Sequence, residues 1–492
     1  MEQILSNIIF LPLFAALVLG LLRVPMRWLR LGATAASLIV LLLVLVVIAY
    51  FDPSGKMQFI RILPWIQNYG ITYYIGVDAL SIVILALISL LMPILYLYMW
   101  KEERKGYWYM MLMLQTGVTG AVLSLDLVLF YLFWETMLLP IFVMIGRYGN
   151  GMYQYNAMKI ILMTILGSMS MLFSILYLGY TYYDTTGSWS FALNDLSTLQ
   201  FNAQTAIWLA AGFLLAFAIK IPLVGFHTWM APAYSSAPTP AVVILSAIMA
   251  KLGVYGLWRF GYGLFETTLV YYAPFIVTLA IIGLLYYAIH AIMEQNLRRM
   301  FAYSSGSHLS LIALGIIVTN IYGWGGSLYF IATHALASAG IFLMIGLLYK
   351  RSGSVRISDL GGIATTAPRF AFFFAFFALS IAGLPGTGGF VAELLIIIGA
   401  FKANMWIGVL TATTMLSAML YIFWMLQRTI FGQQGSHTGT FKDLDMREMV
   451  MLVPLLLLLL VTGIAPSLFM PFFEPQISNT LADVMRAIGG AQ

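Results

Sequence analysis

The chain alternates between long apolar runs and short polar connections. Fourteen runs approach or exceed the roughly 20 apolar residues that a helix needs to cross the hydrocarbon of a bilayer. The runs are residues 4–22, 31–50, 77–99, 108–126, 127–146, 157–180, 205–224, 238–262, 271–293, 301–319, 323–349, 367–402, 405–430 and 449–472. The pattern predicts an all-α integral membrane protein of about 14 transmembrane helices, with residues 1–492 forming a single membrane domain.

Two of the runs carry helix-breaking residues. The run 367–402 is too long for one simple helix, and Gly383, Pro385 and Gly386 interrupt its middle. The run 205–224 contains Pro222, and proline removes a backbone donor and clashes with the preceding turn. Broken helices persist in a membrane only where protein or water satisfies the freed backbone groups, and ion sites are built at such places. We therefore expect helices 7 and 12 to be broken at functional positions.

The distribution of basic residues predicts the orientation of the helices. Most Lys and Arg residues lie in the odd-numbered connections, whereas the even-numbered ones and the C-terminal tail hold Lys56, Arg61, Arg259, Lys402 and Arg486. Because cytoplasmic connections are enriched in basic residues, both termini are expected on the periplasmic or outer side. With no transit segment recognised, a bacterial inner membrane is favoured. The connections 51–76 and 181–204 are then expected to be short structured loops on the outer side.

Composition supports lipid as the solvent and excludes several classes of function. The chain is 62% hydrophobic and 9% charged, against about 25% charged residues in soluble domains. It contains no cysteine, which excludes thiolate-held iron–sulfur clusters. The net charge of +6 is scattered, so no nucleic-acid partner is expected. We find no phosphate-binding loop, dinucleotide fingerprint or cluster of metal ligands, so no cofactor or metal is expected in this chain.

Six ionisable residues lie within the apolar runs. They are Glu135, Lys220, Lys251, His308, His334 and Glu393. Charged groups at the centre of a bilayer cost at least about 2.5–3.5 kcal/mol each, so each one requires an explanation. A lone Glu or Lys can form a structural ion pair, and either histidine can be a hydrogen-bonded core residue. Lys220 and Glu393, however, lie beside the two predicted helix breaks, which favours a role in transport.

The spacing of these residues predicts an internal repeat. Glu393 follows Lys220 by 173 residues, and His308 follows Glu135 by the same interval. Residues 108–262 would form a first repeat of helices 4–8, and residues 271–430 a second repeat of helices 9–13. Five helices per repeat would invert the second copy in the membrane, as in many transporters. The third helix with its loop, 77–107, would precede them, and helix 14, 449–472, would follow.

The alternation of acidic and basic groups indicates proton movement. A carboxylate at Glu135 near Lys220 would stabilise the charged lysine, and weakening that interaction would release a proton. Lys251 and the two histidines would provide further titratable stops. Polar side chains that could hold connecting water are Gln115, Thr116, Ser304, Ser305 and Ser338. Because nothing in the chain supplies energy, a partner or another ion gradient must drive transport.

Four passages resemble the antiporter-like subunits of respiratory complex I, and most closely the M type, which corresponds to mitochondrial subunit 4. The resemblance runs through roughly residues 75–430. The passages are DLVLFYLFWETMLLP, KIPLVGFHTW with APTPAVVILSAIMAKLGVYGLWRF, NLRRMFAYSSGSH, and LPGTGGFVAELLIIIGAF. The resemblance implies a proton-translocating subunit of NADH–quinone oxidoreductase, driven by quinone reduction elsewhere in the enzyme.

The resemblance also implies roles for individual residues. Glu135 is similar to the family's helix-5 glutamate, Lys220 to its helix-7 lysine and Lys251 to its helix-8 lysine. His308 and His334 fall where the family often has polar residues on its central axis. Glu393 matches the helix-12 glutamate of the M type, where the L and N types usually carry lysine.

The resemblance implies partners but no redox chemistry in this chain. The expected partners are L-type and N-type antiporter-like subunits, small membrane subunits and lipid, with flavin, iron–sulfur clusters and quinone in the partner subunits. One passage departs from the family pattern: relatives usually read HTWLPDAH after the helix-7 lysine, but this chain reads HTWMAPAY, with no acidic residue before Ala233 and with Tyr234 in place of the second histidine. The cytoplasmic entry route is therefore expected to differ in detail.

Other functions remain open on the sequence alone. A subunit of a multi-subunit Na⁺/H⁺ antiporter shares most of these motifs, although Glu393 favours complex I. A subunit of a membrane-bound hydrogenase is a further alternative. A structural subunit with static buried ion pairs is the alternative from another class.

Overall fold

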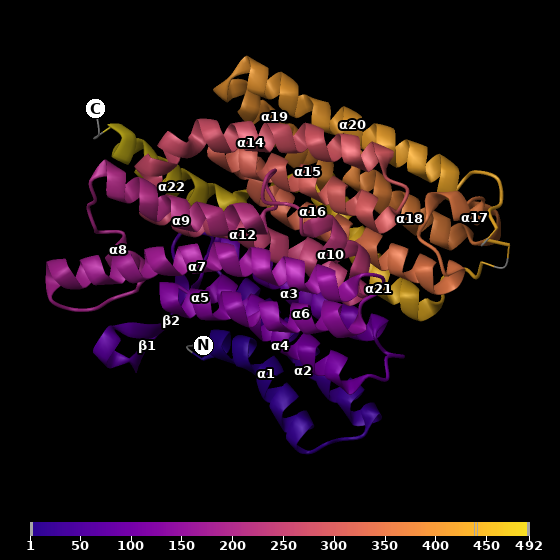
Figure 1. Ribbon diagram of the computed structural model, residues 1–492, viewed down its shortest axis with the longest axis horizontal. Coiled ribbons are helices and arrows are strands. Elements are labelled where there is room, and N and C mark those ends of the chain that lie inside the picture. Colours follow the sequence, from indigo (N-terminus) through magenta and orange to yellow (C-terminus); the bar gives the residue numbers. More distant parts are fainter. Residues whose placement is uncertain (1–2, 437, 440, 490–492) are drawn as a thin grey trace. The chain divides into compact units, whose positions relative to one another are not determined.

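The computed structural model describes residues 3–436, 438, 439 and 441–489 of the chain. The chain divides into two compact units: unit 1 comprises residues 1–220, 252–272 and 472–492, and unit 2 comprises residues 221–251 and 273–471. Within the described residues, 12 helices are long and apolar enough to cross a membrane. The predicted all-α membrane class is therefore confirmed (Figure 1).

Unit 1 contains most of the N-terminal helices and a β-hairpin. Its elements are α1 (Ile4–Leu21), α2 (Met26–Ala49), β1 (Gln58–Ile66), β2 (Ile71–Val77), α3 (Ala79–Tyr98), α4 (Lys105–Leu123), α5 (Leu127–Thr136), α6 (Leu138–Tyr148), α7 (Tyr153–Thr186), α8 (Leu193–Leu196), α9 (Ala203–Lys220), most of α12 (Ala250–Gly256), the π-helical turn η3 (Leu257–Gly261), α13 (Tyr262–Leu264) and most of α22 (Met470–Gly489). Helix α4 packs against α1, α5 and α6, and α7 packs against α9.

Unit 2 is built around α16. Its elements are α10 (Met230–Ser236), α11 (Thr239–Ile244), the π-helical turn η2 (Leu245–Met249), most of α14 (Glu266–Met293), α15 (Leu297–Ile317), α16 (Ile321–Ser352), α17 (Ile363–Thr366), α18 (Pro368–Ile381), α19 (Gly388–Ala403), α20 (Met405–Thr429) and α21 (Met446–Ile464). Helix α16 packs against α11, α15, α18, α19 and α21. Because other helices, and not lipid, surround α16, its side chains are buried along most of its length.

Each of the 14 apolar runs overlaps helical structure, and both predicted breaks are present. Helix α9 ends at Lys220, and helix α18 ends at Ile381 with α19 beginning only at Gly388. Gly225 and Gly386 have φ values of 95° and 91°, a left-handed conformation that glycine adopts without steric cost. The exact count of 14 spans and the two inverted repeats stay predictions.

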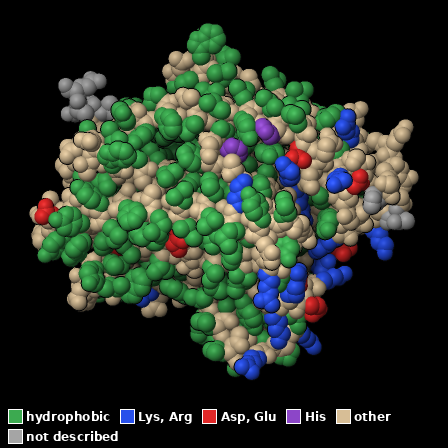
Figure 2. Space-filling view, in the orientation of Figure 1, with side chains coloured by type: hydrophobic (Ala, Val, Ile, Leu, Met, Phe, Trp, Pro, Cys, Tyr) green, Lys and Arg blue, Asp and Glu red, His purple; other side chains and the backbone are tan. Residues whose placement is uncertain are grey.

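The outer surface has the character expected next to lipid. Figure 2 shows hydrophobic side chains over most of the visible face, with few acidic groups. Helix α7 of unit 1 carries large exposed apolar residues, such as Leu166 and Phe173. In a soluble protein so much exposed apolar surface would promote association, so these helices face hydrocarbon or neighbouring chains.

The pattern of apolar runs did not predict the structure of two elements in unit 1. The predicted structured loop at 51–76 is a β-hairpin, with β1 paired antiparallel to β2. After α21 the chain forms a further helix, α22, whose pattern is amphipathic rather than uniformly apolar. Its Gln476 is buried, and its amide oxygen accepts a hydrogen bond from the Leu80 backbone N–H at 3.2 Å. This hydrogen bond joins the C-terminal helix α22 to the first turn of α3.

A buried ion pair lies at this same point and corrects one assignment. Arg259, which the pattern placed in an outer connection, lies in η3 and is 7% exposed. Its guanidinium donates to the carboxylate of Asp78 at 2.6 Å, and its Nε lies 3.2 Å from the Tyr255 hydroxyl. Asp78 is also the N-cap of α3, where it accepts a hydrogen bond from the Ser81 backbone N–H. Arg259 is therefore a buried, paired cation within the predicted run 238–262, and it does not belong to an exposed connection.

Replacing Asp78 with alanine is expected to destabilise the protein strongly. The change leaves the Arg259 guanidinium buried without its carboxylate, and losing one partner of a buried pair costs about 3–5 kcal/mol. The midpoint of thermal unfolding of the detergent-solubilised protein should fall clearly. Asp445→Ala is the matched control, because Asp445 caps α21 in the same way but is exposed and has no cationic partner among the described residues. Losing a cap alone costs about 1 kcal/mol, so equal shifts in the two variants would contradict this role of the ion pair.

Candidate functional site

The break after α9 places a lysine at a helix C-terminus inside unit 1. Lys220 is the last residue of α9 and is 3% exposed. The carbonyl groups at the C-terminal end of a helix carry partial negative charge, which favours a cation there. Pro222 prevents the helix from continuing regularly. The local sequence thus creates a position at which a charged lysine can be held within an apolar helix layer.

Glu135 lies near this lysine, as the sequence predicted, but not in direct contact. The Lys220 ammonium nitrogen lies 4.8 Å from the centroid of the Trp134 ring, and Trp134 directly precedes Glu135 in α5. Glu135 acts electrostatically on Lys220. Within the described structure, however, the lysine Nζ and the glutamate Oε1 are buried without a hydrogen-bond partner. The pair is therefore coupled through space and not locked into an ion pair, which suits a site that gains and loses a proton.

Unpaired polar atoms on α4 extend this part of unit 1. Gln115, Thr116 and Thr119 are buried, and their side-chain polar atoms have no hydrogen-bond partner among residues the structure describes. Helix α4 packs against α5, which carries Glu135. Buried polar groups are normally satisfied by protein or by ordered water. The predicted water-holding role of Gln115 and Thr116 stays a prediction that this arrangement supports.

Lys251 lies between two π-helical turns, η2 and η3. Such turns are rare and occur frequently at functional positions, because the widened turn leaves a backbone carbonyl available. The Lys251 ammonium group donates a hydrogen bond to the Ser246 carbonyl oxygen within η2, and its Nζ lies 2.8 Å from His334 Nδ1 on α16. A fully buried lysine is thus held by a carbonyl and an imidazole.

Four of the six predicted residues lie next to one another in a row in unit 2. After the Lys251–His334 contact, the His334 and His308 rings have centroids 5.2 Å apart, and His308 Nε2 lies 3.6 Å from Glu393 Oε1. The last distance exceeds a normal hydrogen bond. Neither His308 nitrogen and neither Glu393 oxygen has a hydrogen-bond partner in the part of the chain that is described. All four side chains are at most 2% exposed.

The break in helix 12 lies against Glu393. Gly383, in the segment between α18 and α19, has a φ of 77°, and a Cβ atom added to it would lie 3.3 Å from Glu393 Oε2. Glycine at this position therefore serves two purposes. It permits the left-handed backbone, and it leaves room for the carboxylate beside the open end of the helix.

Gly383→Ala is expected to disturb Glu393 as well as the backbone. A non-glycine residue at positive φ costs about 1 kcal/mol or more, and the new methyl group would also press on the carboxylate. We expect both lower thermal stability and lower transport activity per assembled protein. The control is Gly187→Ala, since Gly187 has a nearly identical φ of 76° with no atom within 4 Å of the added Cβ. Equal activity of the two variants would show that Gly383 matters only for its backbone.

The three serines predicted to hold water, Ser304, Ser305 and Ser338, differ in whether they have a hydrogen-bond partner. Ser305 and Ser338 are buried without a partner among described residues, as expected for side chains that hold water. Ser304 instead hydrogen-bonds the Tyr421 hydroxyl at 2.7 Å. Tyr421 on α20 also interacts electrostatically with Glu393. Sequence reasoning missed this tyrosine, because a Tyr in an apolar helix carries no signal that separates a site residue from ordinary packing.

The passage that departs from the family pattern is buried in unit 2. Ala233 and Tyr234 lie in α10 and are both 0% exposed. The Tyr234 ring packs at 76° against that of Phe342, with centroids 5.7 Å apart. Tyr234 therefore contributes an aromatic ring to the core of unit 2. Its effect on proton entry stays a prediction.

Each of the four side chains in this row has a group that can take up and release a proton. A neutral imidazole accepts a proton on one nitrogen and can release another from the second nitrogen. The His334 and His308 rings share no hydrogen bond, so a proton could pass between them only through water or a ring rotation. A water molecule or a small side-chain movement would close the 3.6 Å gap to the carboxylate.

Comparison with known proteins assigns the chain to a family. The family model described as NADH:quinone oxidoreductase/Mrp antiporter, transmembrane, matches residues 124–420. Subunit M of the NADH-quinone oxidoreductase of Rhodobacter capsulatus is 33% identical over 99% of this chain and 98% of its own length. Chain 4 of the NADH-ubiquinone oxidoreductase of Arabidopsis thaliana is 34% identical over 96% of each chain.

Solved structures agree with this assignment. A chain of respiratory complex I from Thermus thermophilus superimposes with a TM-score of 0.89 at 28% identity, covering 97% of this chain and 99% of its own. A chain of the Mrp complex from a Dietzia species has a TM-score of 0.87 at 21% identity, over 98% and 97% of the two chains, which shows a shared fold. The resemblance found in the sequence is confirmed, and the chain belongs to the NADH:quinone oxidoreductase/Mrp antiporter transmembrane family.

Proposed function

We propose that this chain is the M-type antiporter-like subunit of an NADH–quinone oxidoreductase and that it moves protons across the membrane. The observation that carries the proposal is the buried chain Lys251–His334–His308–Glu393 in unit 2. Four adjacent titratable side chains shielded from solvent are costly to bury, and in membrane proteins such groups mark ion pathways. Relatives named subunit M or chain 4 align with nearly the whole length of this chain, which supports the same function.

In the proposed mechanism, each unit holds and passes a proton with its own residues. In unit 1, Lys220 stays protonated while Glu135 is ionised, and it releases its proton when that electrostatic support weakens. In unit 2, a proton passes from Lys251 to His334, then to His308 and on to Glu393, with water bridging the two steps at which no hydrogen bond joins the side chains. Moving one charge against a potential of 100 mV requires about 2.3 kcal/mol. Quinone reduction in partner subunits supplies that energy.

The redox groups are assigned to partner subunits. Flavin, iron–sulfur clusters and the quinone site would lie outside this chain, whose sequence has no cysteine to hold a cluster. L-type and N-type antiporter-like subunits and small membrane subunits are the proposed neighbours in the membrane. The chain is thus one subunit of an enzyme whose electron transfer occurs elsewhere.

Purification of the intact assembly tests this assignment. The native membrane is solubilised in a mild detergent, the assembly is isolated through an affinity tag on this chain, and its subunits and cofactors are recorded. We expect flavin and iron–sulfur signals together with quinone reductase activity. A colourless assembly of hydrophobic subunits that exchanges sodium for protons would contradict the proposal and favour an Mrp-type antiporter.

We further propose a bacterial inner membrane with both termini on the outer side. The support is the concentration of Lys and Arg in odd-numbered connections; in unit 1, exposed basic residues of this kind include Arg23, Arg27 and Lys105. Because the natural chain has no cysteine, single cysteines report topology cleanly. A Ser54→Cys variant should react with a membrane-impermeant maleimide in intact cells, whereas Asn150→Cys should react only after permeabilisation. The reverse labelling pattern would overturn the orientation.

A further inference from the structure

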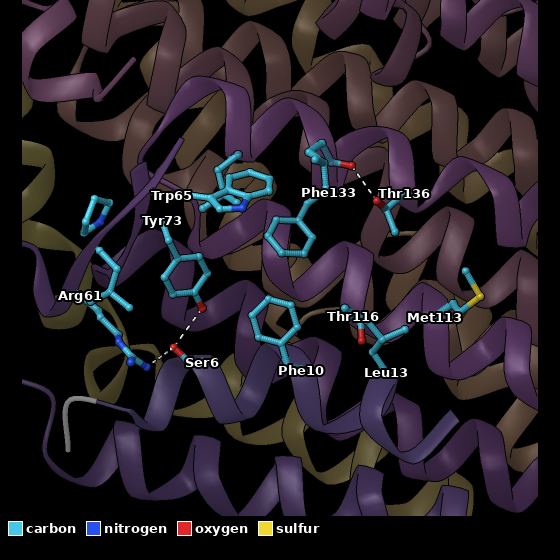
Figure 3. Close-up of a pocket in the computed structure, with 14 residues that line it drawn as sticks. Ser6, Phe10, Leu13, Arg61, Trp65, Tyr73, Met113, Thr116, Phe133 and Thr136 are labelled. Carbon is cyan, nitrogen blue, oxygen red and sulfur yellow. Dashed lines mark hydrogen bonds between the residues drawn. The ribbon is translucent and has the colours of Figure 1, made fainter. Parts of the chain in front are cut away.

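A groove in unit 1 has a polar end and an apolar body. It encloses about 610 Å³ between α1, α4, α5 and the β-hairpin. Figure 3 shows Arg61, Ser6 and Tyr73 together at one end, Phe10 and Phe133 in the middle, and Leu13, Thr116 and Met113 at the other end. A volume in the range 300–1,000 Å³ is typical of ligand sites. The groove therefore has the size and the polarity gradient of a site for an amphiphile.

The polar end carries a cation, Arg61, that has no counter-ion among the residues the structure describes. The Arg61 guanidinium donates a hydrogen bond to the Ser6 hydroxyl at 2.9 Å, and the Tyr73 hydroxyl lies 3.0 Å from the same oxygen. No carboxylate of the described residues lies within ion-pair distance of Arg61. Arg61 donates to one hydroxyl group, that of Ser6, so its other N–H groups can donate to an anion, and its planar fork matches a phosphate.

The body of the groove suits hydrocarbon. The centroid of the Phe10 ring lies 6.2 Å from the centroid of the Phe133 ring and 6.1 Å from that of the Tyr73 ring. Phe10 and Trp65 are 41% and 49% exposed. From Ser6 to Leu13 the groove follows α1 for about 10 Å, at 1.5 Å per residue. The buried Thr116 hydroxyl lines the far end without a partner among described residues.

The position along the chain places the polar end near a membrane surface. Arg61 lies in the β-hairpin that connects two apolar helices, and Ser6 lies in the first turn of α1. Trp and Tyr residues such as Trp65 and Tyr73 are enriched at this level of membrane proteins. A molecule with its charge at Arg61 and its tail along α1 would thus have the orientation of a membrane lipid.

We propose that this groove binds an anionic phospholipid, with the phosphate on Arg61 and one acyl chain lying between Phe10 and Phe133. A neutral isoprenoid would leave the arginine unpaired, and a polypeptide helix from a neighbour would have to bring an acidic residue to the same place. A membrane phospholipid has a phosphate that pairs with the arginine and an acyl chain that fills the apolar part of the groove, and it is present in the surrounding bilayer. Its acyl chain would contact Phe133 and Thr136, which flank Glu135 in α5. The inference does not depend on the proposed transport function.

The test measures lipid binding to the purified assembly. The tagged assembly is delipidated in detergent and titrated with dioleoyl phosphatidylglycerol or dioleoyl phosphatidylcholine, and native mass spectrometry counts lipid adducts on this chain. We expect phosphatidylglycerol to bind preferentially. Arg61→Gln should weaken that binding about tenfold, the size expected for losing a charge-assisted contact. Arg61→Lys should keep much of the preference, because the charge remains.

Two further variants separate the groove from the general surface charge. Leu13→Trp fills the apolar end and should reduce lipid binding while Arg61 is intact. Arg27→Gln removes an exposed arginine that does not line the groove and should change little. Equal binding of the two lipids, or undiminished binding in correctly assembled Arg61→Gln, would overturn the proposal. A density map of the assembly in phosphatidylglycerol nanodiscs that shows a neighbouring polypeptide in the groove would overturn it as well.

Discussion

Replacing Lys220 with methionine is expected to abolish most proton pumping while leaving the complex assembled. Methionine keeps an unbranched apolar stem of similar length, so the packing at the end of α9 is largely preserved. The variant loses the positive charge over the Trp134 ring, which is also the charge that interacts electrostatically with Glu135. A positioned proton-transfer group is typically worth roughly 10²-fold or more in rate. Proton uptake into inverted membrane vesicles, followed with a pH-sensitive dye during quinone reduction, should therefore fall by at least about tenfold.

A matched lysine separates this effect from a general loss of charge. Lys402 on α19 also lies over an aromatic ring, with its Nζ 4.4 Å from the Tyr322 centroid, but it is exposed. Lys402→Met should therefore pump normally. Normal pumping by Lys220→Met, with the same amount of complex on a native gel, would contradict the role proposed for Lys220.

The coupling between Glu135 and Lys220 is testable with a double-mutant cycle. Because the two groups interact through space without a direct ion pair, Glu135→Gln alone should lower pumping, and adding Lys220→Met should lower it little further. Residues that act as one unit give such non-additive losses. Independent and additive losses would instead indicate two separate sites.

Local features of the fold were predictable from the sequence. Apolar runs located the helices, since a bilayer leaves few alternatives for the backbone. Pro222 and the glycines around Pro385 located both breaks, because their effect on the backbone is intrinsic to the residue. The six ionisable residues stood out for the same reason: the cost of burying each one is set by the lipid and hardly depends on the details of packing.

Contacts between distant segments were not predictable. Lys251 and His334 are 83 positions apart, and Asp78 and Arg259 are 181 apart. The sequence showed that Arg259 was basic and near the end of an apolar run, which is also the signature of a connection. The buried counter-ion that reverses this interpretation comes from another helix. The amphipathic α22 was missed for a related reason, since its pattern lacks a long apolar run.

Glu393→Gln is expected to interrupt transport at the end of the unit 2 relay. Glutamine has nearly the same shape and fits beside Gly383, but it cannot take up and release a proton. Glu393 is fully buried, and its Oε1 lies 3.6 Å from His308 Nε2, so no other described carboxylate can replace it at this imidazole. We expect pumping per assembled complex to fall by at least about tenfold, with Glu393→Asp retaining part of the activity because a shorter carboxylate remains.

A second buried carboxylate distinguishes transport from structure. Glu448 on α21 is 6% exposed and pairs with Arg351, so it has the contacts of a structural ion pair. Glu448→Gln should reduce the amount of assembled complex but leave pumping per complex unchanged. Glu393→Gln should do the opposite, because the Glu393 carboxylate has no Lys or Arg partner among described residues and lies only near the His308 imidazole. If Glu393→Gln instead lowered only assembly, the buried chain of unit 2 would be a structural network, and the histidines would be core residues and not proton carriers.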